Sequence, residues 1–222
     1  MAHILFITGT DTGVGKTILT AALTRHLLAR GVKVRAMKPI CSGGRGDARA
    51  LRTAMERAAT LEEINPWHFR AAVAPVLAAR AEKRVVRVAE VTARVRAAAA
   101  RCEVLLVEGA GGVLSPLGEG FDSRDLIVAL RARAIVVAAN QLGAVGLARL
   151  AVAALPPAAA RDARVVLMQP ARPDRASRRN AGLLGEFLGE ERVVVFPRLS
   201  AGERTGRRPL PPGSLTVLKK LL

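Results

Sequence analysis

Residues 9–17 read Gly-Thr-Asp-Thr-Gly-Val-Gly-Lys-Thr, and they directly follow an apolar run at residues 3–8. The apolar run predicts a short buried strand, and the pattern after the loop predicts an amphipathic helix. Glycines let the intervening backbone turn tightly and point its N–H groups at phosphate oxygens. Lys16 supplies a positive charge, and Thr17 supplies a hydroxyl that suits Mg2+. A strand, a glycine-rich loop and a helix in this order form a phosphate-binding loop, so the sequence predicts nucleotide binding.

Apolar runs and helical patterns alternate along the rest of the chain, which is typical of an α/β protein. Several apolar runs are uninterrupted, as expected for parallel strands that helices cover on both faces. We expect strands near residues 3–8, 32–37, 103–107, 134–138, 164–168 and 192–196. We expect helices near residues 16–30, 46–59, 75–82, 89–101, 123–132, 143–155 and 176–189. The sequence therefore predicts one domain, residues 1–222, with a mostly parallel central sheet between two layers of helices.

The composition narrows the partners that the chain is expected to have. The formal net charge is +17, but the basic residues are mostly arginines scattered along the chain, and aromatic residues make up only 3%. This pattern favours solvated basic surfaces over a nucleic-acid interface, although it leaves that alternative open. Two cysteines, Cys41 and Cys102, do not form a disulfide framework. With no apolar run of membrane-spanning length and no basic leader, we expect a cytoplasmic protein.

Polar residues follow the second predicted strand, at the sheet edge where ligands of such folds bind. Lys38 stands at the end of this strand, so we expect it to face the same phosphates as Lys16. Ser42 follows in a glycine-rich segment and either contacts a ligand or makes a turn. Asp47 comes next, where it either caps a helix or binds a metal. Residues 202–213 are rich in arginine, proline and glycine, which predicts an ordered loop or a partly mobile cover.

A carboxylate, Glu108, directly follows the predicted central strand and precedes Gly-Ala-Gly-Gly at residues 109–112. This is the position of an acid that coordinates a metal or orients a water molecule. Mg2+ prefers oxygen ligands, so Thr17, Asp47 and Glu108 would suffice together with two phosphates. Gly143 precedes a later helix, where free N–H groups offer an anion site or the glycine simply makes the turn.

Four blocks of the sequence together resemble the dethiobiotin synthetase family. They are residues 9–17, Lys38-Pro-Ile-Cys-Ser-Gly43, Asn65-Pro-Trp-His-Phe69 and Val107-Glu-Gly-Ala-Gly-Gly112. Partitioning-type ATPases carry a lysine at the position of Asp11, and an aspartate-threonine-proline sequence typically follows their central strand. Asp11 and the block around Glu108 therefore favour the synthetase. The similarity extends over about the whole chain and weakens after residue 160.

The resemblance implies an ATP-dependent ligase that makes dethiobiotin from 7,8-diaminononanoate and CO2. A substrate amine takes up CO2 as a carbamate, a carbamate oxygen attacks the γ-phosphate of ATP, and the second amine closes the ureido ring. ADP and phosphate are released. The resemblance also implies Mg2+ and a homodimer, in which the substrate's carboxylate tail reaches the partner subunit near Gly143.

The same resemblance implies a role for individual residues. The implied catalytic residues are Lys16, Lys38, Thr12 and Ser42. The implied nucleotide-binding residues are Gly13, Val14, Gly15, Lys16, Thr17, Ile18, Gln169 and Pro197. The implied substrate-binding residues are Lys38, Ser42, Gly111, Gly112 and Gly143. The implied metal ligands are Thr17, Asp47 and Glu108.

Some positions depart from the pattern of the family. Gly13, Gln141 and Gly146 stand where the family often has polar side chains that lie near the reacting groups or contact the substrate tail. The asparagine that reads adenine in the family falls near Met168 or Gln169, which predicts relaxed selectivity for the nucleotide base. Two alternatives remain at this point: a partitioning-type ATPase, and a related ligase that acts on another small amine or acid.

Overall fold

The central feature of the protein, seen in a computed structural model that describes residues 2–222, is a six-stranded sheet in the order β10-β9-β8-β1-β5-β2. All five pairings between neighbouring strands are parallel. The six strands are β1 (His3–Gly9), β2 (Val34–Met37), β5 (Val104–Glu108), β8 (Arg133–Ala139), β9 (Arg164–Met168) and β10 (Val193–Phe196). Each of the six predicted strands is thus confirmed, with bounds that differ by at most two residues.

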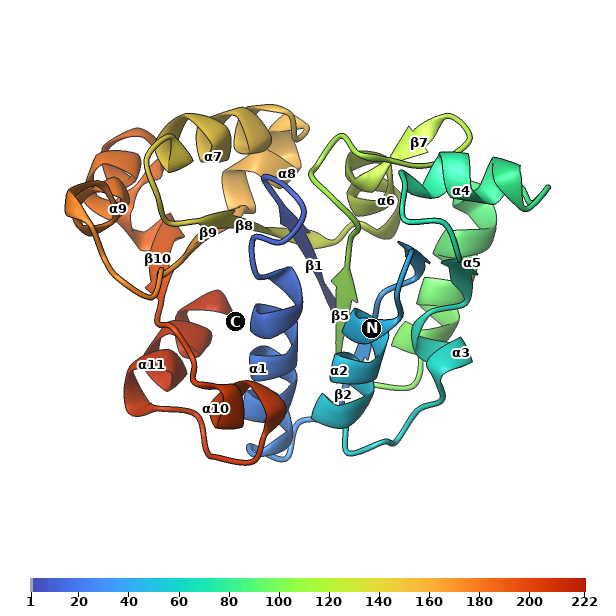
Figure 1. Ribbon diagram of the computed structural model, residues 1–222, viewed down its shortest axis with the longest axis horizontal. Helices are drawn as coiled ribbons and strands as arrows, with labels where there is room; N and C mark the ends of the chain where they lie inside the picture. Colours follow the sequence, from blue (N-terminus) through green and yellow to red (C-terminus); the bar gives the residue numbers. More distant parts are fainter. Residues whose placement is uncertain (1) are drawn as a thin grey trace.

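Two layers of helices enclose the sheet, as predicted (Figure 1). The helices are α1 (Lys16–Leu28), α2 (Gly46–Ala54), α3 (Leu61–Ile64), α4 (Pro75–Ala81), α5 (Val88–Ala99), α6 (Ser123–Leu130), α7 (Ala144–Ala153), α8 (Pro157–Asp162), α9 (Arg175–Leu188), α10 (Ala201–Thr205) and α11 (Pro212–Leu221). A 3-10 turn, η1 (Glu190–Arg192), precedes β10. No helix within residues 2–222 is both long enough and apolar enough to span a lipid bilayer. Residue 1 of the predicted 1–222 domain lies outside the described residues.

Successive residues of β1 point to opposite faces of the sheet and so join two hydrophobic cores. Leu5 and Ile7 pack with residues of α1, α2 and α11 on one face. Phe6 packs with residues of α5, α6, α7 and α9 on the other face. Both cores are lined by strand residues that are almost entirely buried. The uninterrupted apolar runs of the sequence thus reflect a sheet that is covered on both sides.

Helix α1 differs from the amphipathic helix that the sequence predicts. Nine of its 13 residues are buried. Helices α2, α10 and α11 pack against it, so its outer side is also shielded from solvent. The predicted irregular segment at residues 202–213 is only partly right, because α10 ends and α11 begins within it. Leu218 and Leu221 of α11 are fully buried and join the core beside α1.

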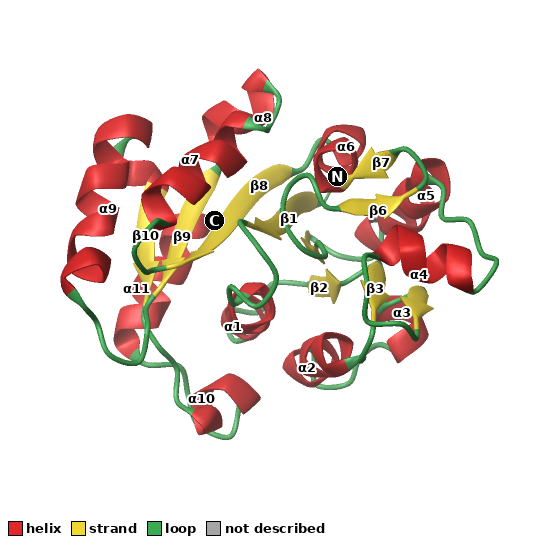
Figure 2. Cartoon of the chain, turned by 45° about the horizontal axis from the view of Figure 1, so that its top comes forward, coloured by secondary structure: helices red, strands yellow, loops and turns green. Residues whose placement is uncertain are grey.

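Two small sheets lie beyond the carboxyl ends of the main strands, and the sequence patterns did not reveal them. The first pairs β3 (Ile40–Ser42) with β4 (Trp67–Phe69) in parallel. The second pairs β6 (Pro116–Gly118) with β7 (Phe121–Asp122) in antiparallel fashion. Figure 2 shows β7 beside α6, and β3 and β6 both contact α4. These strands of two or three residues are too short to produce a clear periodicity.

Candidate active site

The loop between β1 and α1 has the backbone conformation that its glycines allow. Gly13 and Gly15 have φ values of 77° and 103°, which side-chain-bearing residues rarely adopt. A Cβ atom on Gly15 would also come within 3.0 Å of the Met168 side chain at the end of β9. Val14 is 9% exposed and packs in the core, so only its main chain faces a ligand. The loop therefore presents main-chain N–H groups to a phosphate.

Lys16 has no acidic partner in hydrogen-bonding distance. Its Nζ donates a hydrogen bond of 2.7 Å to the main-chain oxygen of Asp11. The carboxylate of Asp11 itself accepts a hydrogen bond of 2.6 Å from the N–H of Thr12. Burial and the charge of Lys38 lower the pKa of Lys16 to about 8, against the opposing charges of nearby carboxylates. An anion bound in the loop would stabilise the charged form of Lys16.

The ends of β2 and β5 and the starts of α1 and α2 bring four polar side chains together. Lys38 Nζ lies 2.8 Å from Glu108 Oε1 and 2.5 Å from Asp47 Oδ2. Thr17 Oγ1 donates a hydrogen bond of 2.7 Å to the same Glu108 Oε1. We call Thr17, Lys38, Asp47 and Glu108 the acid–lysine cluster. All four were predicted from the sequence as site residues, and the structure places them in mutual contact.

Electrostatics fix the charges within the acid–lysine cluster. Burial alone would lower the pKa of Lys38, but the carboxylates of Glu108 and Asp47 outweigh it and raise that pKa. Burial would raise the pKa of Asp47, but the contact with Lys38 outweighs it and lowers that pKa. Lys38 is therefore an ammonium ion and Asp47 a carboxylate at neutral pH.

The chemistry of the cluster fits a small divalent cation. Glu108 has a fully buried side chain, and its Oε2 has no hydrogen-bond partner. A buried carboxylate oxygen without a partner is costly, and a cation would satisfy it. Within residues 2–222 there is no group of three or more His, Cys, Asp or Glu side chains that could hold a metal. A cation here would therefore take few protein ligands and keep positions for phosphate and water oxygens, as Mg2+ does.

Asn65 positions the main chain that carries Lys38. The Asn65 side chain is buried, and its Nδ2 donates a hydrogen bond of 2.8 Å to the main-chain oxygen of Lys38. The N–H of Lys38 in turn donates a hydrogen bond of 2.9 Å to the main-chain oxygen of Ile64. Farther along, His68 Nε2 makes a hydrogen bond of 2.7 Å with the main-chain oxygen of Gly43. The segment 65–69 thus supports the segment 38–43, a role that the sequence did not reveal.

A cleft of about 650 Å³ opens beside the acid–lysine cluster. Ser42 lines it and donates a hydrogen bond of 2.5 Å to the main-chain oxygen of Val73. A Cβ atom on Gly111 would collide with Ser115, so the glycine allows the close packing of this loop. The other predicted residues in its lining are Thr12, Gly13, Gly15, Lys16, Thr17, Ile18, Lys38, Asp47 and Glu108. Sequence reasoning missed its further lining by Cys41, Gly44, Ser115, Pro116 and residues 72–75.

Other predicted site residues do not line this cleft: Val14, Gly112, Gly143, Gln169 and Pro197. Gly143 lies at the start of α7 with a φ of 87°. Gln169 belongs to a network of amides, in which its Oε1 accepts a hydrogen bond of 3.0 Å from Asn140 Nδ2. Asn140 is fixed in turn, because its Oδ1 accepts a hydrogen bond of 2.9 Å from Asn180. The side-chain oxygen of Gln169 is therefore already engaged.

Comparisons with known proteins identify relatives that cover most of this chain. A family described as an AAA domain matches residues 3–204. The ATP-dependent dethiobiotin synthetase of Anaeromyxobacter dehalogenans strain 2CP-1 is 41% identical over 198 residues, which cover 87% of this chain and 89% of that protein. The enzyme of the same name from Bacillus licheniformis is 33% identical over 206 residues, covering 90% of this chain and 88% of that protein.

Solved structures with the same fold include a ParA family ATPase and a cell division protein. A ParA family ATPase from Chlorobium tepidum has a TM-score of 0.64 and 13% identity, with coverage of 100% of this chain and 99% of that chain. The MinD cell division protein of Aquifex aeolicus has a TM-score of 0.61 and 17% identity, with coverage of 99% and 95%. At these identities the likeness shows the fold alone.

The low pKa of Lys16 predicts how nucleotide binding depends on pH. Above pH 8, Lys16 of the free protein loses its proton, and phosphate binding must restore it. The affinity for ADP, measured by calorimetry between pH 7.5 and 9.5, should fall by up to about tenfold per pH unit above 8. The exposed Lys33→Ala variant should keep this slope, and the residual binding of Lys16→Ala should lose it. An affinity that stays constant through pH 9.5 in the unmodified protein would contradict the assignment.

Proposed function

The chain belongs to the family of ATP-dependent dethiobiotin synthetases, and on that premise we propose how its residues perform the reaction. The protein is an ATP-dependent ligase that converts 7,8-diaminononanoate, CO2 and ATP into dethiobiotin, ADP and phosphate in biotin synthesis. The observation that carries this proposal is the acid–lysine cluster beside the phosphate-binding loop. The cluster contains a second lysine, Lys38, and it borders a cleft that has room for a small substrate.

Phosphoryl transfer needs mainly the positioning of the reactants and the neutralisation of charge. The main-chain N–H groups of residues 13–17 and the start of α1 hold the phosphates. Lys16 is buried and has only a main-chain oxygen as its present partner, so the ATP phosphates provide its counter-charge. A carbamate oxygen attacks the γ-phosphorus, the bond from that phosphorus to the bridging oxygen breaks, and ADP leaves.

Lys38 neutralises charge on the carbamate and on the transferred phosphoryl group. Its contacts with Asp47 and Glu108 hold the ammonium in place and keep it charged. Thr12 and Ser42 provide hydroxyl groups at the border of the same cleft. Ser42 already donates its hydrogen to Val73, so its oxygen accepts hydrogen bonds from the substrate amines. The second amine then attacks the carbamate carbon, phosphate leaves, and the ring closes.

The residues that would hold Mg2+ are Thr17, Asp47 and Glu108. When bound, Mg2+ would neutralise charge on the β- and γ-phosphates of ATP. The free Oε2 atom of Glu108 supports this proposal. Gly111, which lines the cleft, would border the diamine, because glycine leaves room for a substrate close to the main chain.

A second copy of the chain completes the site. Leu142 precedes helix α7, and Leu147 and Leu150 lie along it, with exposures of 85%, 50% and 69%. Beside them, the guanidinium of Arg149 stacks on the half-exposed Phe187 ring of α9 at 3.8 Å. A contiguous apolar surface of this kind is typical of a protein interface. Because Gly143 begins the same helix, its N–H groups would then reach the carboxylate tail of the substrate in the partner's cleft.

Activity assays test the proposal directly. With Mg2+, ATP and bicarbonate, phosphate release should depend on 7,8-diaminononanoate, and mass spectrometry should detect dethiobiotin. Lys38→Ala and Lys16→Ala should each lower turnover by about 10²–10³-fold, because each removes a charge that stabilises the transition state. Lys33→Ala, a change of an exposed lysine, should retain full turnover. Phosphate release that is indifferent to the diamine would reject the proposal.

The engaged oxygen of Gln169 predicts relaxed selectivity for the nucleotide base. Asn140 takes one of the two lone pairs of the Gln169 oxygen, so the two N–H groups of Gln169 provide most of the hydrogen bonds that remain for a base. Ring nitrogens and carbonyl oxygens of all common bases accept hydrogen bonds from such N–H groups. Turnover with CTP should therefore be similar to turnover with ATP. Strict dependence on ATP would contradict the role given to Gln169.

The apolar surface on α7 predicts a change of oligomeric state upon mutation. Leu150→Glu places a charge at the centre of the proposed interface, so it should shift the protein from dimer to monomer in sedimentation experiments. It should also raise the KM for the diamine. Val85→Glu changes an equally apolar exposed residue outside this surface and should leave the dimer intact. A monomeric unmodified protein with full activity would refute the shared site.

A further inference from the structure

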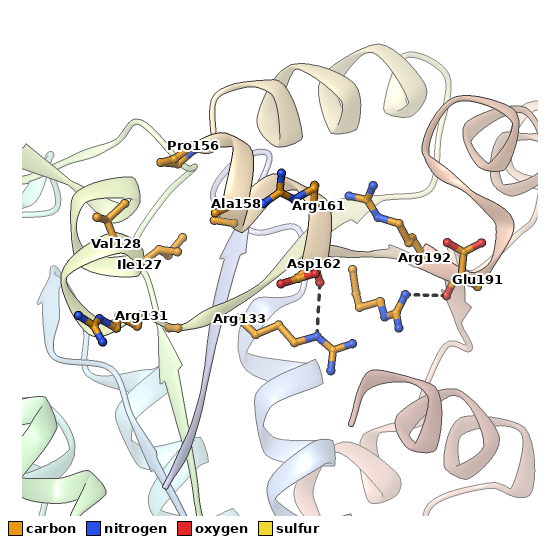
Figure 3. A pocket seen from close by; sticks show the side chains of 13 residues that line it. Ile127, Val128, Arg131, Arg133, Pro156, Ala158, Arg161, Asp162, Glu191 and Arg192 are labelled. Carbon is orange, nitrogen blue, oxygen red and sulfur yellow. Dashed lines mark hydrogen bonds between the residues drawn. The ribbon is translucent and has the colours of Figure 1, made fainter. Parts of the chain in front are cut away.

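A second cavity, of about 850 Å³, lies at the amino ends of central strands, whereas the phosphate-binding loop follows the carboxyl end of β1. Figure 3 shows the side chains that line this cavity. The cavity is located where β8 and β9 begin, beneath α8. Val128, Pro156 and Ala158 form an apolar wall. Five arginines also line it: Arg131, Arg133, Arg161, Arg164 and Arg192. The proposed synthetase reaction uses none of these residues.

Main-chain oxygens hold three of the five guanidinium groups in place. Arg133 Nε donates a hydrogen bond of 3.4 Å to the main-chain oxygen of Asp162. Arg164 Nη1 donates one of 3.2 Å to the main-chain oxygen of Glu191. Arg192 Nε donates one of 3.0 Å to the main-chain oxygen of Ala163. These acceptors are neutral, so they orient the guanidinium groups without cancelling their charge.

The five arginines outnumber the two acidic residues that also line the cavity, Asp162 and Glu191. Across residues 2–222, no ion pair within 4.0 Å includes any of the five arginines. Exposed arginines elsewhere do pair, as Arg80 does with Glu119 at 2.7 Å. Arg164 Nε is buried and has no hydrogen-bond partner. Burial and the charge of Arg164 lower the pKa of Arg133 and outweigh the opposing charge of Asp162.

From this arrangement we propose that the cavity binds a small molecule that carries two or more phosphate groups. Guanidinium groups that are fixed in position and unpaired are suited to phosphate oxygens, which they bind through paired charge-assisted hydrogen bonds. The volume lies within the range of small-molecule sites. A concave site with an apolar wall suits such a ligand better than a nucleic acid, which requires an extended basic surface. The site is separate from the proposed active site and independent of it.

Calorimetry with fructose 1,6-bisphosphate as the probe tests this site. The unmodified protein is compared with Lys16→Ala, which impairs the phosphate-binding loop and changes no residue of the cavity. The probe should bind both proteins with the same affinity at the cavity, and that affinity should fall as the salt concentration rises. Fructose, which lacks the phosphates, should not bind. Absence of binding by the bisphosphate, or binding that Lys16→Ala abolishes, would overturn the proposal.

Matched variants locate the site. Arg161→Gln changes an exposed side chain that makes no hydrogen bond in the described structure, and it should weaken binding about tenfold. Arg164→Gln should weaken it at least as much, and thermal melting of both variants checks that the fold is intact. Arg207→Gln, an exposed arginine remote from the cavity lining, should leave the affinity unchanged. An equal loss in all three variants would indicate general charge attraction and contradict a built site.

Competition by two further ligands distinguishes the proposed bisphosphate site from a site for single phosphate ions or for nucleic acid. Inorganic phosphate should compete with the bisphosphate only weakly, because it engages fewer of the five arginines. A 12-nucleotide single-stranded DNA should not compete at equal phosphate concentration. Tighter binding of the DNA than of the bisphosphate, lost in Arg161→Gln, would replace the proposed ligand class with nucleic acid.

Discussion

The contact between Lys38 and Glu108 is the constraint on which the site depends. Both side chains are almost completely buried and lie 2.8 Å apart. Removing one member of a buried ion pair leaves an uncompensated charge and costs about 3–5 kcal/mol. The same Glu108 oxygen accepts the hydroxyl of Thr17, so this carboxylate links the lysine to the phosphate-binding loop. The site is therefore connected through one buried acid.

Sheet register brings these residues together. In the parallel pairing of β2 with β5, Met37 lies opposite Val107. Lys38 follows Met37 and Glu108 follows Val107, so the two residues lie side by side at the carboxyl ends of β2 and β5. Pairing of β1 with β5 places Ile7 opposite Glu108, and the loop that begins two residues later passes over the same edge. Asn65 then fixes the main chain at Lys38 from outside the sheet.

The sequence was sufficient to predict the six central strands, most of the long helices and the convergence at their carboxyl ends. Uninterrupted apolar runs and the glycine-rich loop determine those features through local physics. The role of Asn65 could not be predicted, because its hydrogen bonds join segments that are 27 residues apart. The burial of α1 was missed for a similar reason. Helices α10 and α11 cover its outer side, and this contact depends on residues near the other end of the chain. The arginine cavity combines residues from three separate segments, 127–133, 156–164 and 191–192, whereas along the sequence its arginines look like part of a general excess.

A crystal structure of the protein with Mg2+ and ADP tests the central claim most directly. The account predicts a diphosphate against the main-chain N–H groups of residues 13–17, and a cation in contact with the Thr17 hydroxyl and the Glu108 carboxylate. Lys38 should remain within the cluster or reach the phosphates from it. A nucleotide bound elsewhere, with Glu108 Oε2 still unpartnered, would contradict the account.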